Sequence, residues 1–148
     1  MNLPPYNTIV AVFAAVFLSG CATNYNQASS QFPPLPAGGG RIFFYRPDAF
    51  YGIGTVNRIN LNGQGLRNLE DGHFFYADRP AGNYAVSFDY SIWGPTATKL
   101  AFTLAPGETK YVRVTEEFGV LSAKPAATLE DKDTAMKTLT RCIYAAYQ

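Results

Sequence analysis

The sequence predicts a mainly β protein, an antiparallel β-sandwich of about seven short strands followed by a C-terminal α-helix. The clearest observation is an alternation of large with small or polar side chains along residues 84–90, which is the period of a strand with one buried face. Turn signals recur at close spacing between short apolar runs. The aromatic residues are mainly 10 Tyr and 11 Phe, and both types favour strands.

The first three strands are expected at the start of the folded region. Residues 41–46 form an aromatic and aliphatic run that a proline ends. Residues 55–61 and 65–69 flank Asn62 and Gly63, and this pair tolerates the positive φ angles that a type I′ hairpin turn requires. We therefore expect these two strands to pair with each other.

The remaining strands follow at similar spacing. They are expected over residues 73–78, 84–90, 100–104 and 109–116, with a last short strand at 119–123. In the strand at residues 109–116, Val112 and Val114 share one face, and Tyr111 and Arg113 share the other.

A helical pattern begins after Pro125. Thr128 followed by Asp131 resembles a capping box in which Asp replaces the usual Glu. The apolar face of the expected helix contains Leu129, Met136, Leu139 and Ile143. We expect this face to pack on the sheet; the alternative is that it docks a partner. Glu130, Asp131 and Asp133 stand where carboxylates favour the helix macrodipole, and a cation site is the alternative.

An address signal lies at residues 18–21, which read Leu-Ser-Gly-Cys and follow an apolar run at residues 8–18. Small residues before a cysteine at the end of such a run are the layout of a secretory signal. The motif resembles a bacterial lipobox, which implies cleavage between Gly20 and Cys21 and acylation of the Cys21 thiol. The alternative, an uncleaved membrane anchor, needs about 20 apolar residues, and this run is shorter.

The lipobox divides the chain into a signal peptide at residues 1–20, a flexible lipidated tether at 21–40 and a domain at 41–148. A tether is expected because Asn, Gln, Ser, Pro and Gly dominate residues 22–40 and offer little surface to bury. Ala22 stands where Asp would follow the cysteine, and by the lipoprotein sorting pattern this implies the outer membrane, facing the periplasm.

Composition argues against several classes of function. The 12 Lys and Arg nearly balance the 11 Asp and Glu, so no basic surface for nucleic acid is expected. One histidine and one thiol besides Cys21 cannot supply the four ligands of a zinc site, and we expect no metal and no cofactor. Cys142 is expected to be an inert, buried group in the helix, with a disulfide between Cys21 and Cys142 as the competing account.

Two groups of residues are candidates for chemistry or binding. A hydrolase needs a histidine oriented by a carboxylate beside a nucleophile, and His73 has Asp71 two residues before it and two serines, Ser87 and Ser91, near a neighbouring strand. We instead expect His73 to be a hairpin-edge residue beside a turn. The candidate binding surface consists of Tyr51, Tyr90 and Trp93. Their rings suit stacking on a sugar or on a partner side chain, although core packing explains Tyr90 equally well.

Several short motifs follow the lipobox and the polar segment in a fixed order. They are Gly-Gly-Arg-Ile-Phe-Phe-Tyr-Arg-Pro at residues 39–47, Ile-Asn-Leu-Asn-Gly at 59–63, the runs at 66–69 and 72–76, Pro-Ala-Gly at 80–82 and Ala-Pro-Gly-Glu-Thr at 105–109. In this order they resemble the bacterial lipoproteins of the domain of unknown function 2846 family, over residues 41–117. The pieces around the two Pro-Gly turns also resemble transthyretin-like sandwich domains. These resemblances imply a β-sandwich fold and a lipid-anchored location, and they provide no catalytic motif.

Taken together, the sequence predicts a membrane-tethered periplasmic lipoprotein that is not an enzyme. We expect an accessory or interaction module of the cell envelope, held to the membrane through Cys21, with an envelope protein as its partner. The alternative is a module that binds peptidoglycan or polysaccharide through exposed aromatic side chains.

Overall fold

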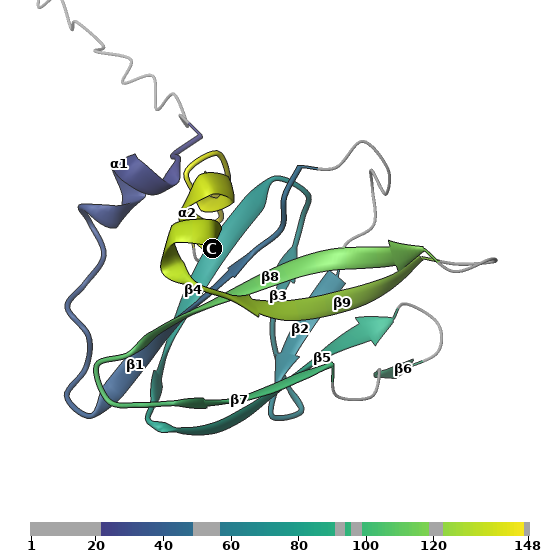
Figure 1. The fold of residues 1–148 in the computed structure, drawn as a ribbon, viewed down its shortest axis with the longest axis horizontal. Coiled ribbons are helices and arrows are strands. Elements are labelled where there is room, and N and C mark those ends of the chain that lie inside the picture. The colour runs from purple at the N-terminus through teal and green to yellow at the C-terminus, as the bar shows by residue number, and fades with distance from the viewer. Residues whose placement is uncertain (1–21, 49–56, 91–93, 96–98, 119–122, 147–148) are drawn as a thin grey trace, which may run out of the picture.

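A computed structural model of the chain describes residues 22–48, 57–90, 94–95, 99–118 and 123–146. Two sheets pack face to face, which confirms the mainly β, sandwich-like fold (Figure 1). The first sheet has the order β10 (Ile143–Tyr144), β4 (His73–Pro80), β1 (Gly39–Tyr45), β8 (Thr109–Phe118) and β9 (Ala123–Glu130). The second sheet contains β3 (Gln64–Leu69), β2 (Asn57–Leu61), β5 (Gly82–Tyr90), β6 (Gly94–Pro95) and β7 (Leu100–Leu104).

The pairing is not wholly antiparallel, and the described residues form ten strands where about seven are expected from the sequence. β1 runs parallel to β8, and β10 runs parallel to β4. Parallel neighbours arise here because strands far apart in the chain are brought together, whereas hairpins join only antiparallel neighbours. A sequence pattern identifies hairpins and gives no information about such distant pairs.

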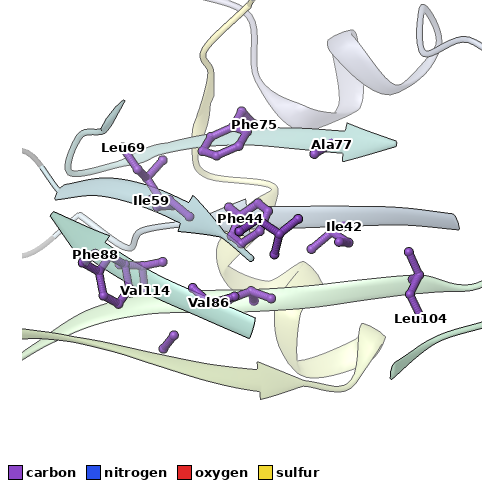
Figure 2. Packing of buried hydrophobic residues seen from close by; sticks show 13 residues of the cluster. Ile42, Phe44, Ile59, Leu69, Phe75, Ala77, Val86, Phe88, Leu104 and Val114 are labelled. Carbon is purple, nitrogen blue, oxygen red and sulfur yellow. The ribbon is translucent and has the colours of Figure 1, made fainter. Parts of the chain in front are cut away.

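An inner core fills the space between the two sheets (Figure 2). The first sheet contributes Ile42, Phe44, Phe75, Ala77, Val112, Val114 and Ala127. The second sheet contributes Ile59, Leu61, Leu69, Val86, Phe88 and Leu104. The alternation is therefore confirmed over residues 84–88, as is the shared face of Val112 and Val114.

The outer face of the first sheet is also buried, beneath two helices. α1 (Tyr25–Ser29) and α2 (Lys132–Leu139) lie on the same side of this sheet (Figure 1). The fully packed members of this outer cluster are Ala28, Phe43, Tyr45, Phe74, Tyr111, Ala135, Leu139 and Cys142. Because β1 contributes to the inner core and to the outer cluster alternately, all seven of its residues are buried.

The prediction of a flexible tether at residues 21–40 is wrong, because its described part folds onto the outer cluster. Asn24 and Gln27 form a reciprocal capping box that starts α1. The rings of Tyr25 and Phe32 lie 5.7 and 5.8 Å from the ring of Phe43. Two aromatic side chains and one buried alanine, Ala28, thus pack a segment whose overall composition is polar.

The C-terminal helix is present and packs on the sheet, but it is shorter than predicted. Its N-cap is Asp131, whose carboxylate accepts a hydrogen bond from the Thr134 amide at 2.9 Å. Thr128 and Leu129 lie in β9, and Ile143 lies in β10. The predicted helix is too long because residues of β9 and β10 happen to continue the helical spacing of apolar side chains.

The turns follow the sequence closely. Asn62 and Gly63 have φ angles of 52° and 77°, as a type I′ hairpin requires, and they join β2 to β3. No described helix is long and apolar enough to span a bilayer.

Close packing at Gly40 gives a stability prediction. A Cβ atom at Gly40 would lie 2.7 Å from the Glu108 carbonyl oxygen and 2.8 Å from Leu104. Gly40→Ala is therefore expected to lower the free energy of unfolding by about 1–3 kcal/mol, as overpacking does. Gly82→Ala is the matched control, because nothing lies within 4 Å of its Cβ position. Urea denaturation measures both, and equal effects of the two substitutions would contradict this packing argument.

Candidate functional site

The structure tests only part of the candidate site. Gly20, Cys21, Tyr51, Ser91 and Trp93 lie outside the described residues. Tyr90 is the last residue of β5, where it pairs with Gly94.

The strand ends next to these aromatic residues lie at one end of the sandwich. Arg58 near the start of β2 pairs with Asp89 near the end of β5, so Tyr90 ends its strand beside the beginning of β2. The guanidinium of Arg46, directly after β1, reaches Leu69 at the end of β3. The segments at 49–56 and 91–93 are thus attached at the same end of the fold.

A buried cluster of charges lies at this end, and we call Arg46, Asp71 and Glu116 the Arg46 cluster. The Arg46 side chain is 3 % exposed. Its Nε lies 2.5 Å from Asp71 Oδ1, and its Nη2 donates to Glu116 Oε1 at 2.9 Å. Its Nη1 donates to the Leu69 carbonyl oxygen at 3.5 Å. The cluster joins β1, β8 and the turn before β4, and through Leu69 it also reaches the second sheet.

Two carboxylates share one guanidinium in this cluster, so its formal charge is negative. Burial raises the pKa of Asp71 above its ordinary value, and the neighbouring charge of Glu116 raises it further, while Arg46 lowers it. The geometry fits a structural ion-pair cluster, because both carboxylates lie within ion-pair distance of Arg46.

Among the described residues, His73, Asp71 and Ser87 are not assembled as the hydrolase alternative requires. His73 Nδ1 lies 2.7 Å from the backbone carbonyl oxygen of Asp71, so the ring nitrogen that faces it carries the proton. The carboxylate of Asp71 contacts Arg46 instead. Ser87 lies in β5 of the second sheet, opposite Asn60, whereas His73 starts β4 of the first sheet. His73 is a strand-edge residue beside a turn, as expected.

The carboxylates at the helix start have structural partners. Asp131 caps α2, and hydrogen bonds from the Thr134 amide and hydroxyl hold the pKa of Asp131 below its ordinary value. Glu130 accepts a hydrogen bond from the Tyr45 hydroxyl and another from Arg113 Nη1 at 3.0 Å. Asp133 lies in the first turn of α2. Within the described ranges, no three His, Cys, Asp or Glu residues are placed to hold a metal ion.

Cys142 is a packed thiol, although it lies just after α2 and not within it. Its residue is 2 % exposed, and burial raises the pKa of its thiol to about 11. Its Sγ donates to the carbonyl oxygen of Thr138 at 3.5 Å. A thiol that stays protonated and buried is a poor nucleophile, which agrees with the inert role expected from the sequence.

The sequence interpretation missed two arginines, Arg41 within β1 and Arg46 directly after it. Arg41 Nε and Nη2 donate to the two carboxylate oxygens of Asp78 at 2.6 and 2.8 Å, and Nη2 also donates to the Pro33 carbonyl oxygen at 2.8 Å. The Arg41 guanidinium lies 4.3 Å from the ring centre of Tyr76. The available signal was a charged residue at each end of an otherwise apolar strand.

The Arg46 cluster predicts a large loss of stability on removing its cation. Arg46→Met leaves two carboxylates buried without their guanidinium, and we expect the free energy of unfolding to fall by about 3–5 kcal/mol. Arg58→Met is the matched control: Arg58 faces Asp89 at 3.7 Å with 57 % of its side chain exposed, and an exposed pair contributes at most about 1 kcal/mol. Urea titrations compare the two, and a small effect at Arg46 would show that the cluster does not clamp the fold.

Asp71 predicts a pH dependence of stability. Its pKa is raised in the folded state, so the folded protein keeps this proton to a higher pH than the unfolded chain does. Unfolding then releases a proton, and stability falls as the pH rises above about 4, the ordinary value of the unfolded group. In Asp71→Asn we expect this part of the slope to disappear. Urea midpoints between about pH 4 and pH 7 measure it, and parallel slopes in the two proteins would refute the assignment.

Comparison with known proteins places the chain in a family. The model of the family described as "Protein of unknown function (DUF2846)" matches residues 36–126, which is more than half of the chain and covers β1 to β8 together with the start of β9. No curated protein and no solved structure matches this chain. The chain therefore belongs to the DUF2846 family.

Proposed function

We propose that the mature chain is a lipid-anchored, non-enzymatic interaction module of the cell envelope, attached through Cys21 to the outer membrane and facing the periplasm. The observation that carries this proposal is the Leu-Ser-Gly-Cys motif at residues 18–21, directly after an apolar run. Ala22 after the cysteine supports the outer membrane as the destination.

The reactive side chains interact with other groups of the fold, and this supports a role without catalysis. The single histidine contacts a backbone carbonyl oxygen, and the nearest carboxylate belongs to the Arg46 cluster. The thiol of Cys142 is buried and has a raised pKa. Among the described residues, His73, Asp71 and Cys142 are thus engaged in a hydrogen bond, an ion pair and packing, respectively.

An exposed sheet edge supports a protein as the partner. β9 is the last strand of the first sheet and pairs within that sheet only with β8. Its Leu129 is one of two large apolar side chains that the described residues leave exposed, at 39 %. An edge strand with an exposed apolar side chain suits the addition of a strand from another protein, because main-chain hydrogen bonds supply affinity there.

Glycan binding is the second candidate. It is favoured because the described strand ends that flank the segments carrying Tyr51 and Trp93 lie at one end of the sandwich. Tyr90, the last residue of β5, lies at the same end. Aromatic rings suit stacking on sugar rings.

Substitution of Cys21 tests the proposed lipid anchor and membrane location. In Cys21→Ser the thiol that would carry the lipid is absent, so we expect the protein to leave the membrane fraction and to lose incorporation of labelled fatty acid. Cys142→Ser is the control, because a buried thiol with a raised pKa should not be acylated, and it should behave as the unchanged protein does. Membrane fractionation with mass spectrometry of the mature N-terminus measures both. Retention of Cys21→Ser in the membrane would contradict the lipid anchor.

Crosslinking in cells tests the partner. A photo-crosslinking side chain at Leu129 is expected to capture one envelope protein, whereas the same side chain at the exposed Gln64, on the edge of the other sheet, is expected to capture none. Recovery of cell-wall glycan, without a protein, would move the proposal to the aromatic residues.

A further inference from the structure

We propose that one end of the edge of the first sheet, where β10 and the chain around Thr23 lie beside the start of β4, is the surface that faces the lipid bilayer. The inference deepens the proposed function and rests on acylation of Cys21. It assigns an orientation to the domain, and it names the headgroup layer of the membrane as the neighbour of this edge.

The chain is fixed to the domain from Thr23 onward. The Tyr144 amide donates to the Thr23 carbonyl oxygen at 2.6 Å, and Asn24 forms a bridge with Ile143. The next residues form α1, whose Ala28 is 3 % exposed within the outer cluster. Arg41 holds the following segment by its hydrogen bond to the Pro33 carbonyl oxygen.

The covalent distance to the lipid is therefore short. Cys21 precedes Thr23 by two residues, and two extended residues span at most about 7 Å. The flexible tether expected from composition, about 19 residues long, would instead allow an average separation of about 25 Å and any orientation. A lipid inserted in the bilayer at Cys21 must hold the surface around Thr23 at the headgroups.

The composition of this surface suits contact with a headgroup layer. A shallow hollow there is lined by Ala22, Thr23, Arg67, Asn68, His73 and Ile143, among others. Ile143 is 37 % exposed, and Arg67 donates to the carbonyl oxygens of Ala145 and Ala146 at 2.7 Å each. The mixture of polar groups with one exposed apolar side chain fits the interface and does not call for deep insertion.

The opposite end of the fold is displaced along the strands. Ile143 pairs with His73 at the start of β4, whereas Pro80 at the other end of β4 pairs with Gly39. Seven steps of a strand separate the two ends by about 23 Å. Asn68 and Gln64 lie four steps apart on β3, which is about 13 Å, with Gln64 at the hairpin turn.

Fluorescence quenching of the full-length lipidated protein tests the orientation. Single cysteines replace exposed residues in Asn68→Cys and Ala146→Cys near the hollow, and in Gln64→Cys and Ala81→Cys at the far turns. Cys142 stays in place, because its buried thiol reacts slowly. Each protein carries one fluorophore and is placed in phospholipid vesicles with nitroxide-labelled headgroups. We expect quenching at Asn68 and Ala146, and no quenching above that in unlabelled vesicles at Gln64 and Ala81.

A linker variant provides the matched control. About ten Gly and Ser residues inserted between Ala22 and Thr23 add a coil of about 18 Å, so the difference in quenching between the two groups of positions should disappear while the protein still floats with the vesicles. Equal quenching at near and far positions without the linker overturns the orientation, although the lipid anchor stands. Failure to float with vesicles, with no acyl chain on Cys21 by mass spectrometry, overturns the proposed function and the orientation with it.

Discussion

Strand β1 is buried on both faces, and the rest of the structure is arranged around that burial. Its inner side chains, Ile42 and Phe44, require the second sheet as a cover, and its outer side chains, Phe43 and Tyr45, require the helices. Its backbone groups have no water to bind, so both edges must be paired. β4 pairs along one edge in antiparallel fashion, and β8 pairs along the other in parallel. The burial of this strand therefore depends on segments that are distant from it in the sequence.

The two ends of β1 carry charges that are buried with it. Arg41 and Arg46 are 8 % and 3 % exposed, and a buried guanidinium is tolerated only where carboxylates and carbonyl oxygens replace water. Asp78 provides this for Arg41, and Asp71 with Glu116 provides it for Arg46. These pairs favour a single register of β1 against its neighbours, because a shift by one residue would bury a charge without a partner. The Arg46 cluster, which gathers buried charges as a functional site would, is thus explained by its role in fixing the register of β1.

Features encoded by neighbouring residues could be predicted from the sequence, and those encoded by distant contacts could not. The hairpin at Asn62 and Gly63, the alternation along β5 and the two faces of β8 are local patterns, and all are confirmed. The partner of Arg46 in β8, Glu116, is 70 residues away, and no pattern indicates that pair. The order of residues 24–32 was missed for the same reason, since their aromatic side chains pack against distant strands, β1, β4 and β10. The lipobox is a local motif, so the candidate address could be predicted where a partner could not.

The burial of β1 and the short link to the lipid that we propose on Cys21 depend on the same packing. Releasing residues 23–33 to lengthen the tether would expose Phe43 and would remove Tyr25 and Phe32 from its ring. If these side chains contribute about 3 kcal/mol together, the released form is populated at less than about 1 %. With the proposed anchor at Cys21, the closeness of the domain to the membrane would follow from the packing of its own core, and no separate interaction with lipid would be needed to maintain it. An envelope partner that binds the exposed edge at β9 would meet a domain held in one orientation, so little rotational freedom would be lost on binding.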